Sequence, residues 1–192
     1  MSDDFRERLN RILPRLTSEG FLHNKGLGNE IGFWIFDYPP EREMDVRGFV
    51  EQVVLPALGK HQPTLRYAVV DLFKLITGLL EDRKLYERML DKQTQQGNDI
   101  ALAALQQVLK EDKLAERIAS QVNVAEVDML LLTGVGAAYP MLRSHTLLAA
   151  LQPVMKATPL VMFYPGRYDG HTLRLFNQLT DNNYYRAFRL VD

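Results

Sequence analysis

Two loops in the last third of the chain carry arginine and histidine side chains that could do chemistry together. Arg143 and His145 follow one apolar run, and Arg167 and His171 follow the next. Guanidinium groups bind anions through parallel N–H donors, and an imidazole changes its charge near neutral pH. The four side chains could therefore form an anion site. A nuclease or phosphotransferase would also need a nucleophile or a metal set, and the histidines show no metal-binding spacing.

Two aspartates stand where other apolar runs end. Asp37 follows the run 33–36, and Asp71 follows the run 65–70. If both runs are parallel strands, their carboxyl ends meet at one edge of a sheet, where paired carboxylates could bind Mg²⁺ or act as acid and base. Aspartate also commonly caps the turn or helix that follows it. We favour this capping interpretation for both residues.

A glycine pair, Gly134 and Gly136, also follows an apolar run. Glycines at such a point are typical of dinucleotide-binding loops, in which the backbone approaches a pyrophosphate at a helix N-terminus. Here Tyr139 and Pro140 stand where that helix should open, and no acidic residue follows about twenty positions later. The pattern favours a structural turn. The alternative is a degenerate nucleotide site formed by Gly134, Gly136, Asp37 and Asp71.

Apolar runs separated by amphipathic segments predict an α/β protein. Because these runs are apolar throughout, they indicate strands buried on both faces, as in a parallel sheet. The predicted strands are 33–36, 65–70, 127–132, 160–164 and an edge strand at 184–191. The predicted helices are 5–16, 44–58, 72–80, 82–96, 98–121, 144–152 and a short one beginning near 169–171. We expect a mostly parallel sheet of about five strands flanked by helices, with a helical insertion between the second and third strands.

Length and composition fit one domain. The chain has 192 residues, 46% of them hydrophobic, so it can bury a core of its own. We expect a single domain over residues 1–192, from which the helical block 82–121 could protrude. The sequence has no cysteine, which excludes disulfides. It also has no uninterrupted apolar stretch of about 18 residues, so we expect no membrane span. Because the first residues are acidic, we expect no signal peptide and a cytoplasmic protein.

Charge is balanced overall but uneven along the chain. Lysine and arginine total 23 against 24 acidic residues, so the net charge does not favour nucleic-acid binding. After Glu126 there are four aspartates, no glutamate, and six lysine or arginine residues. This mildly basic third could touch phosphates, which keeps a nucleic-acid-binding module as an alternative.

The two loops that contain Arg143 and Arg167 also carry side chains that are favoured at the centres of protein interfaces. Tyrosine, methionine and arginine are enriched there. We predict a partner-binding surface formed by Tyr139, Met141, Arg143, His145, Tyr164, Arg167, Tyr168 and His171. Some of the aromatic rings must also pack the loops against the sheet. We predict no catalytic residue, metal site or cofactor, so the expected role is binding rather than catalysis.

Four segments of the chain together resemble a known family. They are 33–39, 131–136, 139–145 and 159–170. These segments are similar to the BrxB family of bacteriophage exclusion (BREX) defence systems, and the loop 164–170 is the most specific of the motifs. The likeness covers most of the chain.

The resemblance implies a role in a multi-protein system that restricts phage and marks host DNA by methylation. Such systems include a DNA methyltransferase, a large ATPase and PglZ, a protein of the alkaline-phosphatase type. The family looks like an accessory or adaptor subunit, with a PglZ-like protein as its expected direct partner. No catalytic residues come with the resemblance. The oligomeric state and the strand order stay open.

Overall fold

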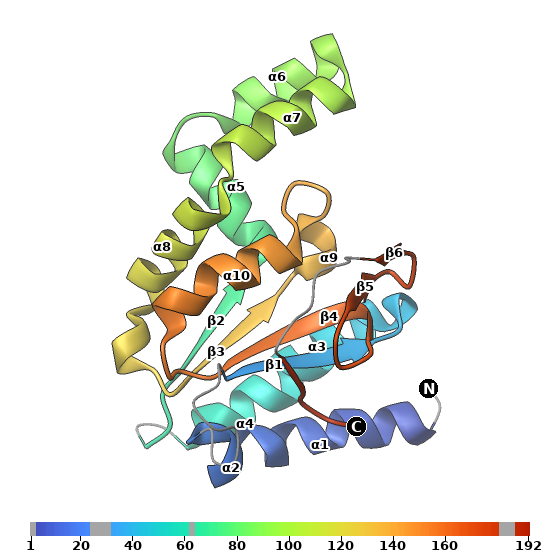
Figure 1. The fold of residues 1–192 in the computed structure, drawn as a ribbon, viewed down its shortest axis with the longest axis vertical. Coiled ribbons are helices and arrows are strands. Elements are labelled where there is room, and N and C mark those ends of the chain that lie inside the picture. Colours follow the sequence, from blue (N-terminus) through green and yellow to red (C-terminus); the bar gives the residue numbers. More distant parts are fainter. Residues whose placement is uncertain (1–2, 24–31, 62–63, 181–186) are drawn as a thin grey trace.

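The centre of the computed structural model is a mostly parallel sheet (Figure 1). The structure describes residues 3–23, 32–61, 64–180 and 187–192. Within these ranges, parallel strands follow the order β2-β3-β4-β1-β7, β5 pairs antiparallel with β4, and β6 pairs antiparallel with β5. The strands are β1 (Phe33–Tyr38), β2 (Tyr67–Asp71), β3 (Met129–Thr133), β4 (Leu160–Tyr168), β5 (Leu173–Leu175), β6 (Leu179–Thr180) and β7 (Phe188–Arg189). The predicted α/β class is confirmed.

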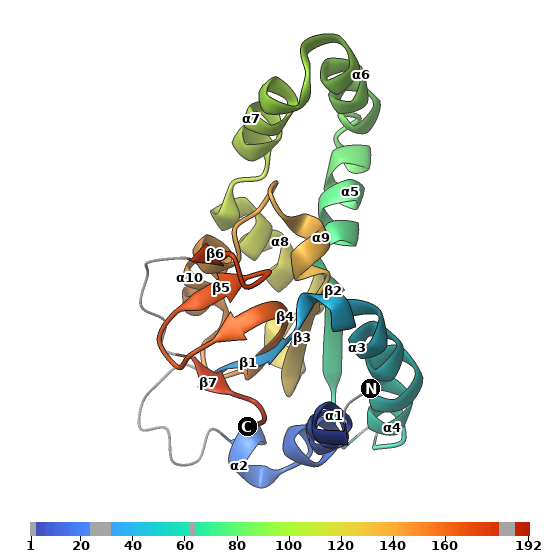
Figure 2. The ribbon, with the colours of Figure 1, turned by 90° about the vertical axis from the view of Figure 1, so that its right-hand side faces the viewer.

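Helices cover both faces of this sheet (Figure 2). One face carries α1 (Asp3–Leu16), α2 (Glu19–Leu22), α3 (Glu43–Phe49), the π-helix η2 (Val50–Val54) and α4 (Leu55–Gly59), with the short η1 (Pro40–Arg42) before α3. The other face carries α5 (Leu72–Asp82), α8 (Glu111–Val122), α9 (Val135–Ala138) and α10 (Ser144–Met155), with η3 (Val124–Glu126) before β3. The sheet is therefore the middle of three layers.

Neighbouring strand residues alternate between the two helical layers. In β1, Ile35 belongs to the cluster with α5 and α10, whereas Trp34 and Phe36 pack with α1 and α3. In β3, Leu130 and Leu131 divide in the same way. Because helices cover both faces, each strand needs apolar side chains at consecutive positions. This is the physical reason for the uninterrupted apolar runs in the sequence.

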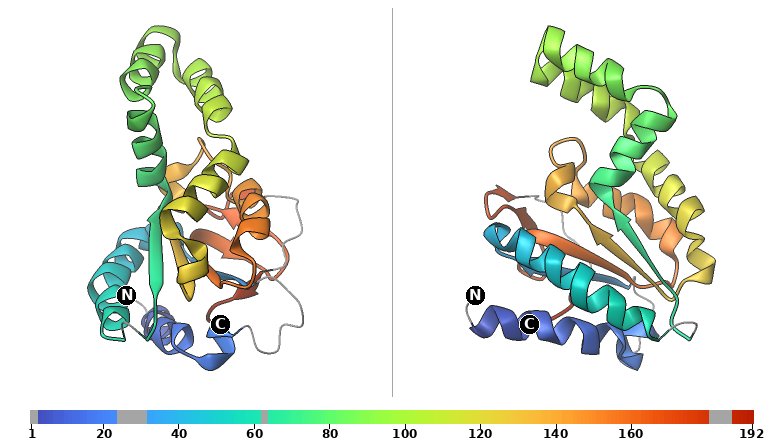
Figure 3. Two further views of the ribbon diagram at one scale, coloured as in Figure 1. Left: turned by 90° about the vertical axis from the view of Figure 1, so that its left-hand side faces the viewer. Right: turned by 180° about the vertical axis from the view of Figure 1, so that it is seen from behind.

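A helical hairpin projects beyond the sheet (Figures 1 and 3). It consists of α6 (Tyr86–Gln96) and α7 (Asn98–Val108), and it belongs to the insertion between β2 and β3 that the sequence predicts. The two helices meet at Gly97, whose φ of +87° suits a residue without a side chain. No residue of α6 is buried, and Ala101 is the buried residue of α7. The hairpin therefore has little core of its own.

The single predicted helix 98–121 is wrong, because the chain breaks it into α7 and α8. Leu109 lies at the break, is 2% exposed, and packs into the core on the α5 side of the sheet. Burying a leucine side chain stabilises the fold by about 2 kcal/mol, which exceeds the loss of a few helical positions of weak intrinsic preference. Tertiary packing thus decides where the helix stops.

The short helix predicted to begin near 169–171 is also wrong. β4 continues through Tyr168, and Leu173–Leu175 pairs with it as β5. The apolar residues at 173, 176 and 179 match a helical spacing, but long-range pairing with β4 decides the conformation. Of the predicted edge strand 184–191, residues 184–186 lie outside the described ranges, and β7 pairs with β1 in the remainder.

Candidate functional site

Asp37 is a buried carboxylate that joins two parts of the fold. It lies in β1 and is 8% exposed. Its Oδ1 accepts a hydrogen bond from the Arg8 guanidinium of α1 at 2.9 Å, and its Oδ2 accepts one from the backbone N–H of Tyr168 at 2.9 Å. Both oxygens are therefore used to hold α1 and the end of β4 against β1.

Asp71 has a separate structural role at the far side of the sheet. Its Oδ1 accepts a hydrogen bond from the backbone N–H of Lys74 at 3.0 Å, which makes Asp71 the N-cap of α5. Because β3 and β4 stand between β2 and β1, Asp71 and Asp37 are separated by three strand spacings, roughly 14 Å. The alternative of paired carboxylates is therefore wrong. The favoured capping interpretation is confirmed for Asp71 and wrong for Asp37, whose oxygens bond Arg8 and Tyr168 instead.

An added side chain would collide with neighbouring atoms at both glycines. Gly134 has a φ of +71°, and a Cβ placed on it would lie 2.5 Å from Oδ1 of Asp71. A Cβ on Gly136 would lie 3.0 Å from the Pro165 ring and 3.1 Å from the Phe176 ring. The helix that follows Gly134 ends after four residues. These contacts explain the glycines as close packing and favour the structural-turn interpretation over a pyrophosphate site.

A small pocket of about 190 Å³, lined by both apolar and charged side chains, lies between the carboxyl ends of β1, β2 and β3 and the helices α3 and η2. In its wall, the Tyr38 hydroxyl donates to Oε2 of Glu43 at 2.6 Å, and Arg47 donates to Oε1 of the same carboxylate at 3.3 Å. Burial, with a contribution from the Glu43 charge, raises the pKa of Tyr38 far above its usual value. Ligand pockets usually measure about 300–1,000 Å³, so this one is small for a nucleotide.

Tyr164 and Tyr168 do not belong to an accessible surface, contrary to the sequence prediction. Both are fully buried. The single proton of the Tyr168 hydroxyl is within donating distance of two carbonyl oxygens, those of Gly170 at 2.9 Å and Ala187 at 2.7 Å. Tyr164 packs in the core on the α5 side of the sheet, and Tyr168 also turns into that core because β4 continues to it. Tyr168 orders the loop through its hydroxyl contacts.

The other predicted partner-binding residues differ in exposure. Arg143, Arg167 and His171 are exposed. Tyr139 and Met141 are half-buried, and His145 in α10 is 9% exposed. The list therefore mixes residues that can contact a partner with residues that support the loops.

The two predicted loops meet through one aromatic contact. The rings of Tyr139 and Phe176 pack edge to face, with centroids 5.9 Å apart and planes at 84°. Phe176 lies in the turn between β5 and β6, so this pair joins the loop after α9 to the hairpin after β4. The structure thus brings both loops to one edge of the sheet, as the sequence suggests.

An open apolar groove lies in the helical arm, and we call it the arm groove. It measures about 540 Å³ and is lined by Phe73, Ile76, Thr77, Leu80, Tyr86, Met89, Leu90, Gln93, Asn98, Asp99, Ala101, Leu102, Leu105, Pro140 and Met141. Phe73 is 42% exposed and Leu90 is 43% exposed. The groove is not among the sites predicted from the sequence, although apolar residues at helical spacing in 86–105 indicate it.

No helix within the described ranges is long and apolar enough to cross a membrane. The same residues contain no group of three or more histidine, aspartate or glutamate side chains that could hold a metal ion. The fold is that of a three-layer α/β protein. Near the carboxyl edge of its sheet lie the apolar arm groove and several exposed arginines.

Comparison with known proteins assigns this α/β protein to a family. A family model described as BREX protein BrxB matches residues 68–190. The BREX protein BrxB of Escherichia coli O9:H4 (strain HS) is 41% identical over 184 residues, which cover 96% of this chain and 90% of the relative. The BREX protein BrxB of Bacillus cereus (strain H3081.97) is 41% identical over 190 residues, which cover 97% of each chain. No solved structure matches the chain.

The chain therefore belongs to the BrxB family, whose members are components of BREX phage-defence systems. This confirms the resemblance seen in the sequence. Membership in this family implies that the chain belongs to a system with other BREX components.

Proposed function

We propose that this chain is a non-enzymatic, cytoplasmic adaptor that binds a PglZ-like protein in a BREX complex. Family membership supports a multi-protein setting, and the resemblance of the loop motifs suggests the partner. The contact surface is formed by the loop 139–143 at the carboxyl edge of the sheet, extended by the arm groove that this loop helps to line.

The open arm groove is the observation that carries this proposal. Pro140 and Met141 form one wall of it, so the predicted contact loop and the groove are a continuous surface. Large apolar side chains such as Phe73 and Leu90 are accessible there. Continuous apolar surface on a folded protein usually marks an interaction site. Burying it against a partner would stabilise a complex by about 25 cal/mol for each Å² of apolar area removed from water.

The state of the carboxylates supports a binding role over catalysis. Asp37 and Asp71 lie far apart, and both oxygens of Asp37 already accept hydrogen bonds from the protein. A site of two carboxylates needs both to reach the same substrate or ion. The loop 139–143 and the arm groove instead form a surface that suits contact with another protein.

The test is co-purification of a tagged copy from a BREX-containing host after nuclease treatment. Wild-type chain should recover the PglZ-like protein in stoichiometric amount. Leu90→Glu should reduce that recovery about tenfold or more, because it places a charge in an apolar interface. The matched control is Val53→Glu, since Val53 is 44% exposed and does not line the groove.

Two results would contradict the proposal. One is a wild-type chain that recovers no PglZ-like protein. The other is Leu90→Glu recovery equal to that of Val53→Glu, which would remove the arm groove from the contact surface. Urea unfolding of both variants shows whether any loss comes from misfolding, because exposed positions should change stability by less than about 0.5 kcal/mol.

A nucleic-acid-binding module is the second candidate, and exposed arginines are the observation that favours it. Arg143, Arg167 and Arg174 all reach solvent in the C-terminal third. Binding through phosphates should weaken steeply as salt rises. A 20-base-pair duplex titrated at low and moderate salt separates the candidates, because absent or salt-independent binding would remove this one.

A further inference from the structure

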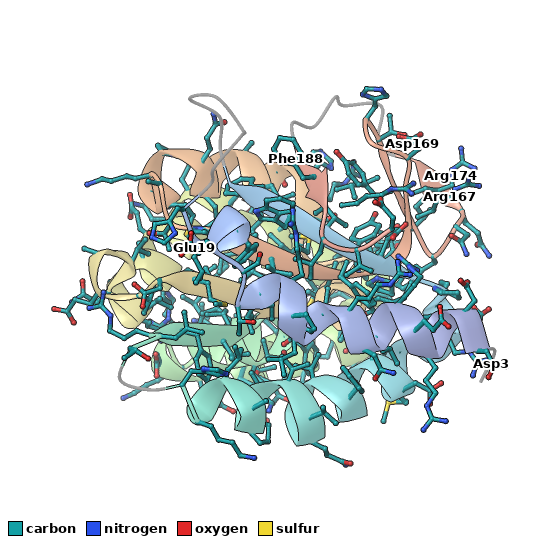
Figure 4. The ribbon with its side chains drawn as sticks, turned by 90° about the horizontal axis from the view of Figure 1, so that it is seen from below. Asp3, Glu19, Arg167, Asp169, Arg174 and Phe188 are labelled. Carbon is teal, nitrogen blue, oxygen red and sulfur yellow. The ribbon has the colours of Figure 1, made fainter. Side chains whose placement is uncertain are left out.

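Arg167 and Arg174 form a pair on the outer face of the hairpin that the end of β4 makes with β5. They are directly opposite each other in the antiparallel register of β4 and β5. Their neighbours on the same strands, Tyr168 opposite Leu173 and Gly166 opposite Leu175, are buried. Since side chains alternate between faces along a strand, both arginines point outward on one face. Figure 4 shows their side chains extending from the same end of the molecule.

The nearby Asp169 carboxylate is bonded within its own turn and not to either arginine. Oδ1 of Asp169 accepts hydrogen bonds from the backbone N–H groups of Thr172 at 2.7 Å and His171 at 2.9 Å, and its Oδ2 accepts one from the Thr172 hydroxyl at 2.8 Å. Across the described part of the chain, Arg167 and Arg174 have no ion pair or side-chain hydrogen bond. Like charges directly opposite each other in a sheet are unfavourable, so the pair is suited to an external anion.

The hairpin holds the two arginines in fixed positions. A Cβ on Gly166 would collide with the backbone carbonyl of Arg174, so the two strands approach as closely as glycine allows. The buried Tyr168 anchors β4, and the Arg189 guanidinium donates to the Tyr168 carbonyl oxygen. Binding an anion here therefore costs little ordering of the backbone.

We propose that Arg167 and Arg174 together clamp two carboxylates of an acidic helix on a partner protein. Directly opposed residues in a sheet have Cβ atoms about 4.5–5.5 Å apart. Carboxylates one turn apart on a helix have Cβ atoms at a similar spacing, about 5–6 Å. Each guanidinium can then bind one carboxylate through two parallel N–H donors. The specificity determinant is a pair of Asp or Glu residues at positions i and i+4 of that helix.

The small number of accessible cations favours a protein over a nucleic acid. A duplex-binding surface typically makes about 6–10 phosphate contacts. Among the residues that the structure describes here, the paired strands offer these two arginines, and the neighbouring Arg189 is already bonded to Tyr168. The net charge of the whole chain is −1. Two carboxylates match two guanidinium groups in number and spacing, whereas a phosphate backbone would need a wider basic surface.

This inference rests on the proposed adaptor function, and its test uses the same co-purification with different variants. Arg167→Glu with Arg174→Glu should lower recovery of the partner about tenfold or more, since opposed like charges then meet across the interface. Arg167→Lys with Arg174→Lys keeps the charge but loses the forked donors, so recovery should fall to an intermediate level. The control is Arg6→Glu with Lys60→Glu, which reverses two exposed cations elsewhere on the surface.

Each outcome separates this inference from the proposed function. If wild-type chain recovers the partner and the Arg167→Glu, Arg174→Glu variant recovers as much, the clamp is wrong and the adaptor function stands. If wild-type chain recovers no partner, both are overturned. Salt-sensitive binding of a 20-base-pair duplex that this variant alone abolishes would reassign the pair to phosphates and overturn the carboxylate assignment.

Discussion

Tyr139 and Phe176 are packed edge to face, with ring centroids 5.9 Å apart, although 36 residues separate them in the sequence. This contact joins the loop after α9 to the turn of the β5–β6 hairpin. On one side of it lies the arm groove, through Pro140 and Met141. On the other side, the paired strands β4 and β5 carry Arg167 and Arg174. The aromatic pair therefore connects the two surfaces that we assign to partner binding.

A double-mutant cycle measures this connection. Tyr139→Ala and Phe176→Ala should each destabilise the protein, and the double variant should lose less than the sum of the two. The coupling should be about 0.5–1.5 kcal/mol, as for other edge-to-face aromatic pairs. Urea unfolding gives the three free-energy differences. Additive losses would mean that the loops are held independently.

Asp37→Asn should destabilise the fold by about 2–4 kcal/mol, because it leaves the Arg8 guanidinium without its charge partner. The loss should appear as a lower urea midpoint. The matched control is Asp45→Asn, since the Asp45 carboxylate pairs with Arg42 at 3.1 Å while 45% exposed. That change should cost less than about 0.5 kcal/mol. Unchanged stability in Asp37→Asn would leave the buried pair without a structural role.

Gly134→Ala should cost more than Gly170→Ala, although both glycines have positive φ angles, +71° and +96°. Both substitutions carry about 1 kcal/mol of backbone strain. At Gly134 the new Cβ would also meet Oδ1 of Asp71 at 2.5 Å, whereas nothing lies within 4 Å of the one at Gly170. The additional loss should be about 1–3 kcal/mol. Equal losses in thermal or urea unfolding would show that the Asp71 contact relaxes freely.

The hairpin turn should stay formed in acid to a lower pH than a free aspartate would allow. The Thr172 backbone N–H, the Thr172 hydroxyl and the His171 backbone N–H hold the pKa of Asp169 well below its usual range. A lowered folded-state pKa stabilises the turn at pH values above the unfolded pKa of about 3.9, and this contribution is lost as pH falls through the folded value. NMR titration of the Asp169 carboxyl carbon and the Thr172 amide should show no transition near pH 4.

Asp169→Asn is the control for that titration. The variant keeps a side-chain oxygen that can accept a hydrogen bond but has no charge to titrate, so the Thr172 amide should lose its acid transition. A wild-type midpoint near pH 4 would contradict the turn contacts.

Several features of the fold follow from local sequence patterns. Uninterrupted apolar runs predict strands buried on both faces, and helices do cover both faces. The helical insertion between the second and third strands also follows from periodicity, as does the position of Asp71 at the start of α5. These features depend on residues close together in the sequence, so a single sequence is sufficient to find them.

The residues of the candidate site are brought together by strand pairing between segments far apart in the sequence, which local sequence patterns do not reveal. The order of the strands separates Asp37 from Asp71, and pairing with β5 carries β4 onward to Tyr168. Arg174 enters the candidate site because backbone pairing places it opposite Arg167.

By itself, the sequence determined the α/β class, the inserted helices, the two loops of the candidate edge and the family resemblance. Tertiary structure decided which side chains of those loops are accessible: Tyr164 and Tyr168 are buried, while the arm groove remains open. The physical reason is that periodicity reports which face of an element is apolar. Whether another element covers that face is settled by long-range packing.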